Sequence, residues 1–220
     1  MTPALGAVLV MAKAPRPGHV KTRLHPLLGE AGAARLQAQL ICHTTEVTIR
    51  ARLHTHLAFD PPDAHADLAR MVPGQVRLLP QRRDDLGRRL TTAVADTFAE
   101  HAGPLLVIGT DAPTLTPALL TAAIFHLGEA DVVLGPALDG GYYLIGLTRP
   151  QPALFAIDPA LWGTDQVLAA TLSAARAHGL TVRMLPRLRD LDTPEDAAAL
   201  LTDPLLPAPV ARLLTPVEAP

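Results

Sequence analysis

A segment directly after the first apolar run carries only positive charge. The first 29 residues contain no Asp or Glu, and all of their Lys and Arg side chains lie in residues 13–24. These cations are Lys13, Arg16, Lys21 and Arg23. Ammonium groups and guanidinium forks bind phosphate oxygens, and Gly18 lets a ligand approach the backbone closely. The segment therefore predicts a loop that binds a polyphosphate, with a solvated basic loop as the alternative.

This loop does not match two familiar nucleotide-binding motifs. A P-loop places glycine directly before its Lys-Thr pair, whereas this chain has Val20 before Lys21 and Thr22. No Gly-x-Gly-x-x-Gly sequence follows this or any other apolar run, so a Rossmann dinucleotide site is unsupported. The predicted phosphate site is therefore of another type.

A carboxylate follows another apolar run, at the point where a strand would end. Asp111 comes two residues after the run 105–109. Ligands bind at the carboxyl ends of strands in open α/β sheets, and carboxylates there are suitable ligands of Mg²⁺ beside phosphate. Asp111 is thus a candidate metal ligand, with a role in capping a turn as the alternative.

Two further carboxylates lie near the other end of the chain. Asp190 and Asp192 are two residues apart and precede an expected helix, so in extended backbone both project to one side. Carboxylates placed in this way repel each other unless a cation lies between them. A divalent metal is one candidate for that cation, and the neighbouring Arg187 or Arg189 is the other.

Two more polar segments follow expected strands. Residues 81–90 carry six charged side chains, which suit either an ordinary charged helix start or contacts to a base or ribose. The sequence Asp139-Gly140-Gly141 leads into Tyr142 and a further strand. An Asp-Gly-Gly sequence is common in hairpin turns, which is the alternative to a ligand-binding role.

Seven short apolar runs alternate with segments of helical period. The first run, 6–11, is apolar on both faces, as a strand buried between two helix layers is, and similar runs recur along the chain. This alternation predicts a mostly parallel sheet in a three-layer α/β/α sandwich. No helix fits between the fifth and sixth runs, so one antiparallel strand is expected. The expected strands are 6–11, 55–59, 76–79, 105–109, 132–135, 142–147 and 182–185, and the expected helices are 36–47, 86–100, 117–127, 165–177 and 195–201.

Length and composition predict one domain with a short extension. The 220 residues are 49% hydrophobic, which supplies one sizeable core. We expect the domain to span residues 1–202. Residues 203–220 contain five prolines and are expected to form an irregular surface segment or a strap.

Composition also excludes several classes of partner. A net charge of −2 and an aromatic content of 3% argue against nucleic-acid binding, and the single Cys42 excludes an internal disulfide. No uncharged stretch is long enough to cross a membrane, and the first apolar run lacks the basic start of a signal peptide. We therefore expect a cytoplasmic location and no membrane partner.

Six motifs, taken in order, resemble one bacterial family. They are KAPRPGHVKTRL, DDLGRRL, GTDAPTL, GPALDGGYYLIGL, WGT and DLDTPEDA. Over residues 5–201 the chain is similar to the DUF2064 family, also called selenodomain-associated transferase 1. That family is similar in fold to molybdenum-cofactor guanylyltransferase and 2-phospho-L-lactate guanylyltransferase. The resemblance implies a GT-A-like nucleotide-diphospho-sugar transferase fold.

The resemblance also implies roles for individual residues. The expected nucleotide and phosphate contacts are Lys13, Gly18, Lys21, Arg23, Asp85 and Gly87. The expected Mg²⁺ ligands are Asp111, Asp190 and Asp192, and the expected acceptor contacts are Asp139, Gly140 and Tyr142. Within this set, Asp111, Lys21 and Arg23 are the expected catalytic residues, because Asp111 would hold the metal that neutralises the diphosphate and the two cations would stabilise charge on the phosphates.

The favoured hypothesis is a Mg²⁺-dependent transferase with a nucleotide donor. Nucleotidyl transfer from a nucleoside triphosphate to a small phosphorylated or carboxylate acceptor is preferred, because Asp111 lacks the Asp-x-Asp pattern typical of many glycosyltransferases. A glycosyltransferase that uses a nucleotide-diphospho-sugar is the first alternative. A non-catalytic nucleotide-binding regulator on the same scaffold is the second. The base, the acceptor and the oligomeric state are left open.

Overall fold

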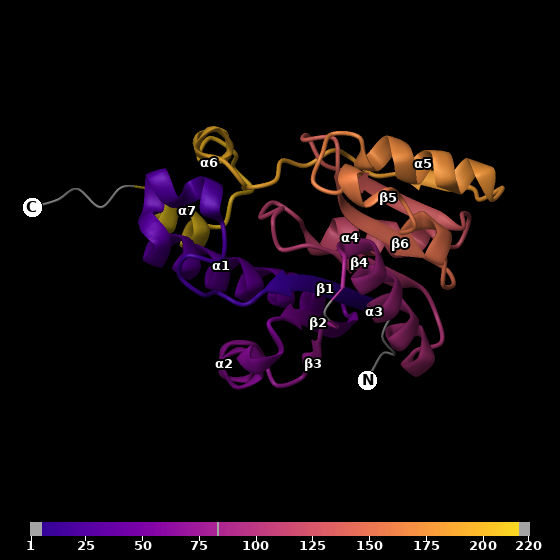
Figure 1. The fold of residues 1–220 in the computed structure, drawn as a ribbon, viewed down its shortest axis with the longest axis horizontal. Coiled ribbons are helices and arrows are strands. Elements are labelled where there is room, and N and C mark those ends of the chain that lie inside the picture. The colour runs from indigo at the N-terminus through magenta and orange to yellow at the C-terminus, as the bar shows by residue number, and fades with distance from the viewer. Residues whose placement is uncertain (1–5, 83, 216–220) are drawn as a thin grey trace, which may run out of the picture.

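The computed structural model describes residues 6–82 and 84–215, which are built around one seven-stranded sheet (Figure 1). The strand order is β3-β2-β1-β4-β6-β5-β7. The strands are Ala7–Lys13 (β1), His54–Asp60 (β2), Arg77–Pro80 (β3), Leu105–Ile108 (β4), Val132–Pro136 (β5), Tyr142–Leu147 (β6) and Val182–Met184 (β7). All seven overlap the expected runs. The five inner strands are buried on both faces and leave a continuous apolar signal, whereas β3 and β7 at the two edges are partly exposed.

Six of the seven strands run in one direction. β1 pairs in parallel with β2 and β4, β2 with β3, and β5 with β7. β6 is antiparallel to both β4 and β5, as the short link before it predicts. The carboxyl ends of β1 and β4 therefore lie side by side at one edge of the sheet.

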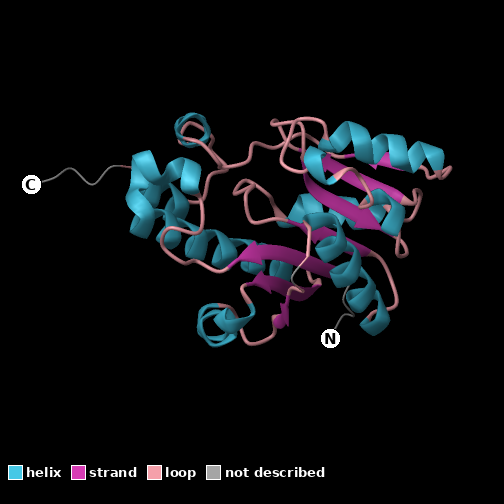
Figure 2. Ribbon diagram, viewed as in Figure 1, coloured by secondary structure: helices cyan, strands magenta, loops and turns pink. Residues whose placement is uncertain are grey.

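Helices cover both faces of the sheet (Figure 2). Val8 and Val10 of β1 belong to the core shared with α1, α2 and α4, whereas Ala7 and Leu9 belong to the core shared with α3 and α5. This alternation makes the predicted three-layer α/β/α sandwich. The helices are His25–Arg50 (α1), His65–Met71 (α2), Leu86–Glu100 (α3), Pro117–His126 (α4), Val167–Ala177 (α5), Pro194–Leu200 (α6) and Ala208–Leu214 (α7).

Local sequence signals define where several helices begin. Thr116 and Thr193 cap α4 and α6, and a proline follows each of them at the first helical position. The cap of α6 is reciprocal: the Thr193 hydroxyl accepts from the Asp196 amide, whose carboxylate accepts from the Thr193 amide. Within the described part of the chain, no helix is both long enough and apolar enough to cross a membrane.

A third, smaller core lies beside the N-terminal half of α1, beyond the sheet. Leu24 and Leu191 are fully buried in it, together with Val210 and Leu214 of α7. Figure 1 shows α7 against the indigo start of α1. Where an irregular surface segment or a strap was expected, the structure has a packed helix at Ala208–Leu214. Residues 216–220 lie outside the described residues.

Two helices were not expected from the sequence. α2 and α7 are seven residues long, about two turns, and too short for a helical period to stand out. α1 is longer than expected because a first turn at His25–Leu28 joins the main helix across Gly29, whose φ of 66° is not helical. Glycine tolerates this conformation at the kink. The helix expected from the sequence covers only residues after the kink.

His56 is the one buried histidine among the described residues. It lies on β2 with 2% of its surface exposed, and its Nδ1 has no hydrogen-bond partner. The ring of His101 meets it edge-on at 5.0 Å between centroids. Burial, followed by the proximity of His101, lowers the pKa of His56 to about 4. The protein therefore holds this side chain neutral well below its usual range.

We predict that His56 makes stability depend on pH between about 6.5 and 4. The pKa of His56 is lower in the folded protein than in the unfolded chain. The neutral side chain therefore contributes fully to the free energy of unfolding above pH 6.5, and this contribution is lost as pH falls towards 4. Relative to His56→Leu, the wild type should lose about 2 kcal/mol of unfolding free energy between pH 7 and pH 4.5.

Denaturant unfolding of both proteins at the two pH values measures this difference. The comparison with the variant cancels other titrating groups, and His178→Gln is the matched control because His178 is exposed and is not among the groups that shift the His56 pKa. A difference between wild type and His56→Leu that does not change with pH would show that His56 does not titrate as described.

Candidate active site

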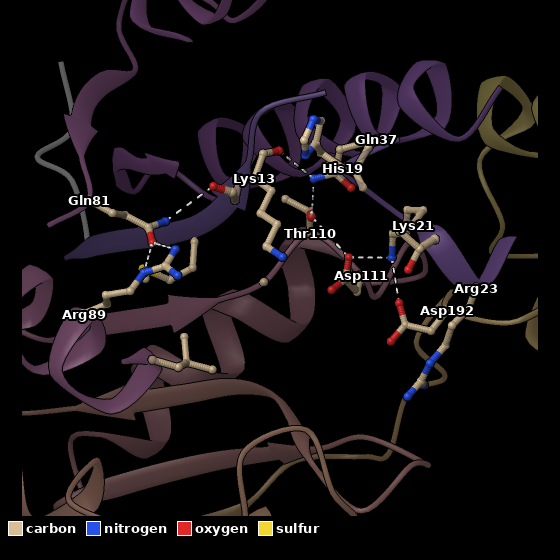
Figure 3. A pocket seen from close by; sticks show the side chains of 16 residues that line it. Lys13, His19, Lys21, Arg23, Gln37, Gln81, Arg89, Thr110, Asp111 and Asp192 are labelled. Carbon is tan, nitrogen blue, oxygen red and sulfur yellow. Dashed lines mark hydrogen bonds and ion pairs between the residues drawn. The ribbon is translucent and has the colours of Figure 1, made fainter. Parts of the chain in front are cut away.

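A cavity of about 600 Å³ lies at the carboxyl ends of β1 and β4 (Figure 3). Lys13 ends β1, and Gly109, Thr110 and Asp111 directly follow β4. Because β1 and β4 are parallel neighbours, these residues reach the same wall of the cavity. The loop after β1 and the segment before α6 complete this side. Five of the predicted site residues thus line one cavity: Lys13, Lys21, Arg23, Asp111 and Asp192.

Lys21 lies at the centre of this group (Figure 3). Its Nζ donates to Asp111 Oδ1 at 2.6 Å, to the Leu191 carbonyl at 2.7 Å and to Asp192 Oδ1 at 2.9 Å. Only 5% of the Lys21 side chain is exposed, compared with 43% of Asp111 and 37% of Asp192. Burial on its own would lower the pKa of Lys21, but the two carboxylates, Asp111 first, outweigh burial and raise it. The ammonium is therefore firmly charged.

The sequence predicted a cation beside Asp192 but not which one. A divalent metal and the neighbouring arginines were the candidates, and in the structure Lys21 holds Asp192 together with Asp111. Arg189 instead pairs with Asp196 at 2.9 Å, at the start of α6. The two carboxylates are thus joined by a residue from the loop that was expected to bind phosphate.

Asp190 is placed differently from Asp192. Its Oδ1 is buried and has no hydrogen-bond partner within the described chain. Burial, followed by the charges of Asp111, Asp139 and Asp192, raises the pKa of Asp190 to about 8. The structure therefore brings the three predicted metal ligands near one another, but Lys21 directly contacts only Asp111 and Asp192.

The oxygen atoms at this end suit a hard divalent cation. Carboxylate and carbonyl oxygens surround the Lys21 ammonium, and Asp190 adds a nearby carboxylate with an unpaired oxygen. Across residues 6–82 and 84–215, however, no three His, Cys, Asp or Glu side chains are arranged as a metal site. The donor types fit Mg²⁺, while the ammonium lies between two of the carboxylates.

A glutamine from α1 fixes the wall between the two strand ends. The Gln37 side-chain amide donates to the Lys13 carbonyl at 3.1 Å and to the Thr110 hydroxyl at 3.3 Å, and the Thr110 hydroxyl donates to Asp111 Oδ1 at 3.3 Å. Gln37 is 4% exposed. Sequence reasoning missed it; the available signal was one polar residue among the apolar positions of a helix.

The other end of the cavity is formed by Gln81, Leu86 and Arg89. The Gln81 amide nitrogen donates to the Ala58 carbonyl at 2.6 Å, and its oxygen accepts from Arg89 Nε at 2.8 Å and also from Nη2. Gln81 is buried and thereby fixes the guanidinium of Arg89, which also lies 3.6 Å from Asp60. The polar segment 81–90 signalled this region, but the sequence did not identify these two residues.

Positive charge exceeds negative charge in the cavity. Its charged lining residues are Lys13, Lys21, Arg23, Arg89, Asp111 and Asp192. Lys13 and Arg23 have no ion pair within the described residues, so both are available to a ligand. Four cations against two carboxylates favour an anionic ligand.

Asp85, Gly87 and Gly18 do not line this cavity. Asp85 caps α3 by accepting from the Arg88 amide at 2.9 Å. Gly87 packs closely: a Cβ there would come within 2.4 Å of the Phe155 carbonyl. Gly18 makes the turn of the loop with a φ of 80°. These three residues shape the elements that carry Lys21 and Arg89.

The expected acceptor residues do not line the cavity; they lie just before β6 and at its first residue. Asp139 is exposed and accepts from the Gly141 amide at 2.9 Å, which forms the expected turn. Gly140, with a φ of 90°, packs against the Asp165 backbone. Burial raises the pKa of the Tyr142 hydroxyl to about 12, and that hydroxyl lies near Thr171 of α5. The structure does not bring Tyr142 together with the lysines and carboxylates.

We predict that Lys21→Met destabilises the protein whereas Arg23→Met does not. Loss of the ammonium leaves Asp111 and Asp192 facing each other, which should lower the unfolding free energy by about 1–3 kcal/mol. Arg23 makes no ion pair in the described chain, so its loss should cost less than about 0.5 kcal/mol. Urea unfolding measures both, and equal stability of Lys21→Met and wild type would contradict the prediction.

Comparison with known proteins gives relatives over most of the chain. A family model described as "Uncharacterized protein conserved in bacteria (DUF2064)" matches residues 43–164, which is more than half of the sequence. A phosphoenolpyruvate guanylyltransferase from Rubrobacter xylanophilus is 31% identical over 187 residues, which cover 82% of this chain and 86% of the relative.

Solved structures show the same fold. The crystal structure of a putative nucleotide-diphospho-sugar transferase from Desulfovibrio desulfuricans G20 matches with a TM-score of 0.88 and 28% identity, covering 96% of this chain and 94% of that one. Rv0371c from Mycobacterium tuberculosis H37Rv, solved in complex with manganese, matches with a TM-score of 0.53 and 19% identity, covering 90% and 98%. The family model, which matches more than half of the sequence, shows that the chain belongs to the DUF2064 family.

Proposed function

We propose that this protein is a nucleotidyltransferase that transfers the GMP unit of GTP to a small phosphorylated acceptor, with phosphoenolpyruvate as the first candidate. The observation that carries the proposal is the cavity at the ends of β1 and β4, where four cations face two carboxylates. GTP supplies the negative charge that this cavity lacks. The relative from Rubrobacter xylanophilus, a phosphoenolpyruvate guanylyltransferase, supports the choice of donor and acceptor.

The reaction requires positioning and charge stabilisation more than covalent help from the protein. An oxygen of the acceptor phosphate attacks the α-phosphorus of GTP, the bond between that phosphorus and the bridging oxygen breaks, and pyrophosphate leaves with the electron pair. Lys13 and Arg23 have no ion pair among the described residues, so both can bind the phosphates and stabilise the leaving pyrophosphate. The acceptor phosphate is already ionised, so no general base is needed.

Asp111, Asp190 and Asp192 are the proposed ligands of a divalent metal, with Mg²⁺ as the first candidate. Their oxygen atoms are of the right type, and Asp190 has a buried oxygen without a partner. When bound, such an ion would neutralise the diphosphate charge. Asp111 is the third residue after β4, and its Oδ1 also accepts from the Thr110 hydroxyl.

The nucleoside is proposed to lie towards Leu86 and Arg89. Asp85 and Gly87 contribute by starting α3 and fixing its packing, which positions these two lining residues. Gly18 contributes through the turn of the phosphate loop. Since GTP is the proposed donor, the protein is expected in the cytoplasm.

The acceptor is proposed to enter from the side of the Asp139–Gly141 turn. The charge of Asp139 is one of those that raise the pKa of Asp190, which supports an approach from the side of the carboxylates. Gly140 shapes the turn through its close contact with Asp165. Tyr142 would act through β6 and α5, since its hydroxyl is buried near Thr171.

A glycosyltransferase that uses a nucleotide-diphospho-sugar is the second candidate. The structure from Desulfovibrio desulfuricans, named as a putative nucleotide-diphospho-sugar transferase, favours it. Many glycosyltransferases carry an Asp-x-Asp pattern, whereas this chain has Gly109 two residues before Asp111. This difference favours nucleotidyl transfer.

Turnover assays separate these candidates. We expect pyrophosphate release with GTP, Mg²⁺ and phosphoenolpyruvate, and a guanylylated product by mass spectrometry. Asp111→Asn should lower the rate about a hundredfold or more, while Asp67→Asn, an exposed change on α2, should leave it unchanged. Turnover with a nucleotide sugar in place of GTP would establish the second candidate. Nucleotide binding without turnover of any donor would indicate a regulator.

A further inference from the structure

The ammonium of Lys21 has no hydrogen-bonding capacity left for a ligand. A lysine ammonium has three N–H donors, and Lys21 meets three acceptors, Asp111, the Leu191 carbonyl and Asp192, at 2.6–2.9 Å. A phosphate oxygen can therefore bind this ammonium only if at least one of these contacts breaks. In the described state Lys21 does not act as a phosphate ligand.

The same contacts restrict access to the carboxylates. Asp111 Oδ1 and Asp192 Oδ1 both accept from the ammonium, and more than half of each side chain is covered. A metal ion bound by both carboxylates would be repelled by the charge of Lys21 and would compete with it at the two Oδ1 atoms. Departure of the ammonium therefore favours both phosphate binding by Lys21 and metal binding by the two carboxylates.

The backbone of Lys21 has an uncommon conformation that the fold must hold in place. Its φ of 48° and ψ of 42° are left-handed, a conformation that costs a residue with a side chain roughly 1 kcal/mol or more. Lys21 and Arg52 are the only residues other than glycine with positive φ in the described chain. Such a conformation persists only where the surrounding structure fixes it.

The surroundings allow the side chain of Lys21 to move while its backbone stays fixed. Leu24, three residues later, and Leu191, whose carbonyl accepts from Lys21, are fully buried in the core that contains α7. These anchors hold both backbone segments together without the ammonium. The four-carbon side chain of lysine can then turn towards the cavity without any movement of the helices.

We propose that Lys21 is a tethered cation: in the free protein it occupies the position between Asp111 and Asp192, and it leaves for the phosphates of a bound nucleotide, so that a divalent metal binds this pair only together with nucleotide. This proposal rests on the proposed function, because a polyphosphate must receive the ammonium. Nucleotide and metal then increase each other's affinity by the same factor.

Manganese binding without nucleotide is the direct test. Free Mn²⁺ measured by electron paramagnetic resonance during titration gives the affinity of the wild type, Lys21→Met and the milder Lys21→Gln. We expect weak binding by the wild type and binding at least about tenfold tighter by both variants. Arg23→Met removes a positive charge from the same cavity and should bind Mn²⁺ like the wild type.

Thermal unfolding provides a second readout that does not depend on activity. Mn²⁺ alone should raise the melting temperature of the Lys21 variants but not that of the wild type. With the wild type, Mn²⁺ and the α,β-methylene analogue of GTP together should raise it by more than the two separate shifts combined, and this excess should shrink in the Lys21 variants.

Two outcomes would overturn the proposal. One is wild type that binds Mn²⁺ without nucleotide as tightly as the Lys21 variants do. The other is Lys21 variants that lose Mn²⁺ binding, which would make Lys21 a fixed support of the metal site. Failure of the proposed function is distinguishable, because it appears as the absence of turnover with GTP, whatever the Mn²⁺ titrations give.

Discussion

One ammonium group joins the parts of the chain that form the site. Lys21 contacts Asp111 across 90 residues of sequence and Asp192 across 171. The sheet makes the first contact possible by placing the ends of β1 and β4 side by side. The core around Leu24 and Leu191 makes the second possible by holding the segment before α6 against the loop after β1. Without this cation, Asp111 and Asp192 would repel each other at the point where a nucleotide is proposed to bind.

Much of the fold could be predicted because its five inner strands are buried on both faces. The run from Val132 and the run from Tyr142 are apolar throughout, and the short link between them required the antiparallel strand that the structure contains. The N-caps Thr116 and Thr193 gave the starts of two helices. The helix at Ala208–Leu214 was missed because it is only seven residues long and its environment comes from α1, α6 and the residues Leu24 and Leu191.

The site was predicted in its parts but not in its contacts. Residues at strand ends were identified because topology brings such positions together, and Lys21, Asp111 and Asp192 do line one cavity. Their direct pairing depends on a left-handed turn at Lys21 and on the path of a distant segment, neither of which has a local sequence signal. Gln37 and Gln81 were missed because each acts through buried hydrogen bonds to backbone and neighbouring side chains, which only the tertiary structure reveals.

The most direct test of the account is a crystal structure of the protein with Mn²⁺ and the α,β-methylene analogue of GTP, with anomalous scattering used to place the metal. We expect the phosphates to contact Lys13 and Arg23, the anomalous peak to lie at Asp111 and Asp192, and the Lys21 ammonium to contact a phosphate oxygen. A nucleotide bound elsewhere, or a metal on these carboxylates with Lys21 still between them, would contradict the account.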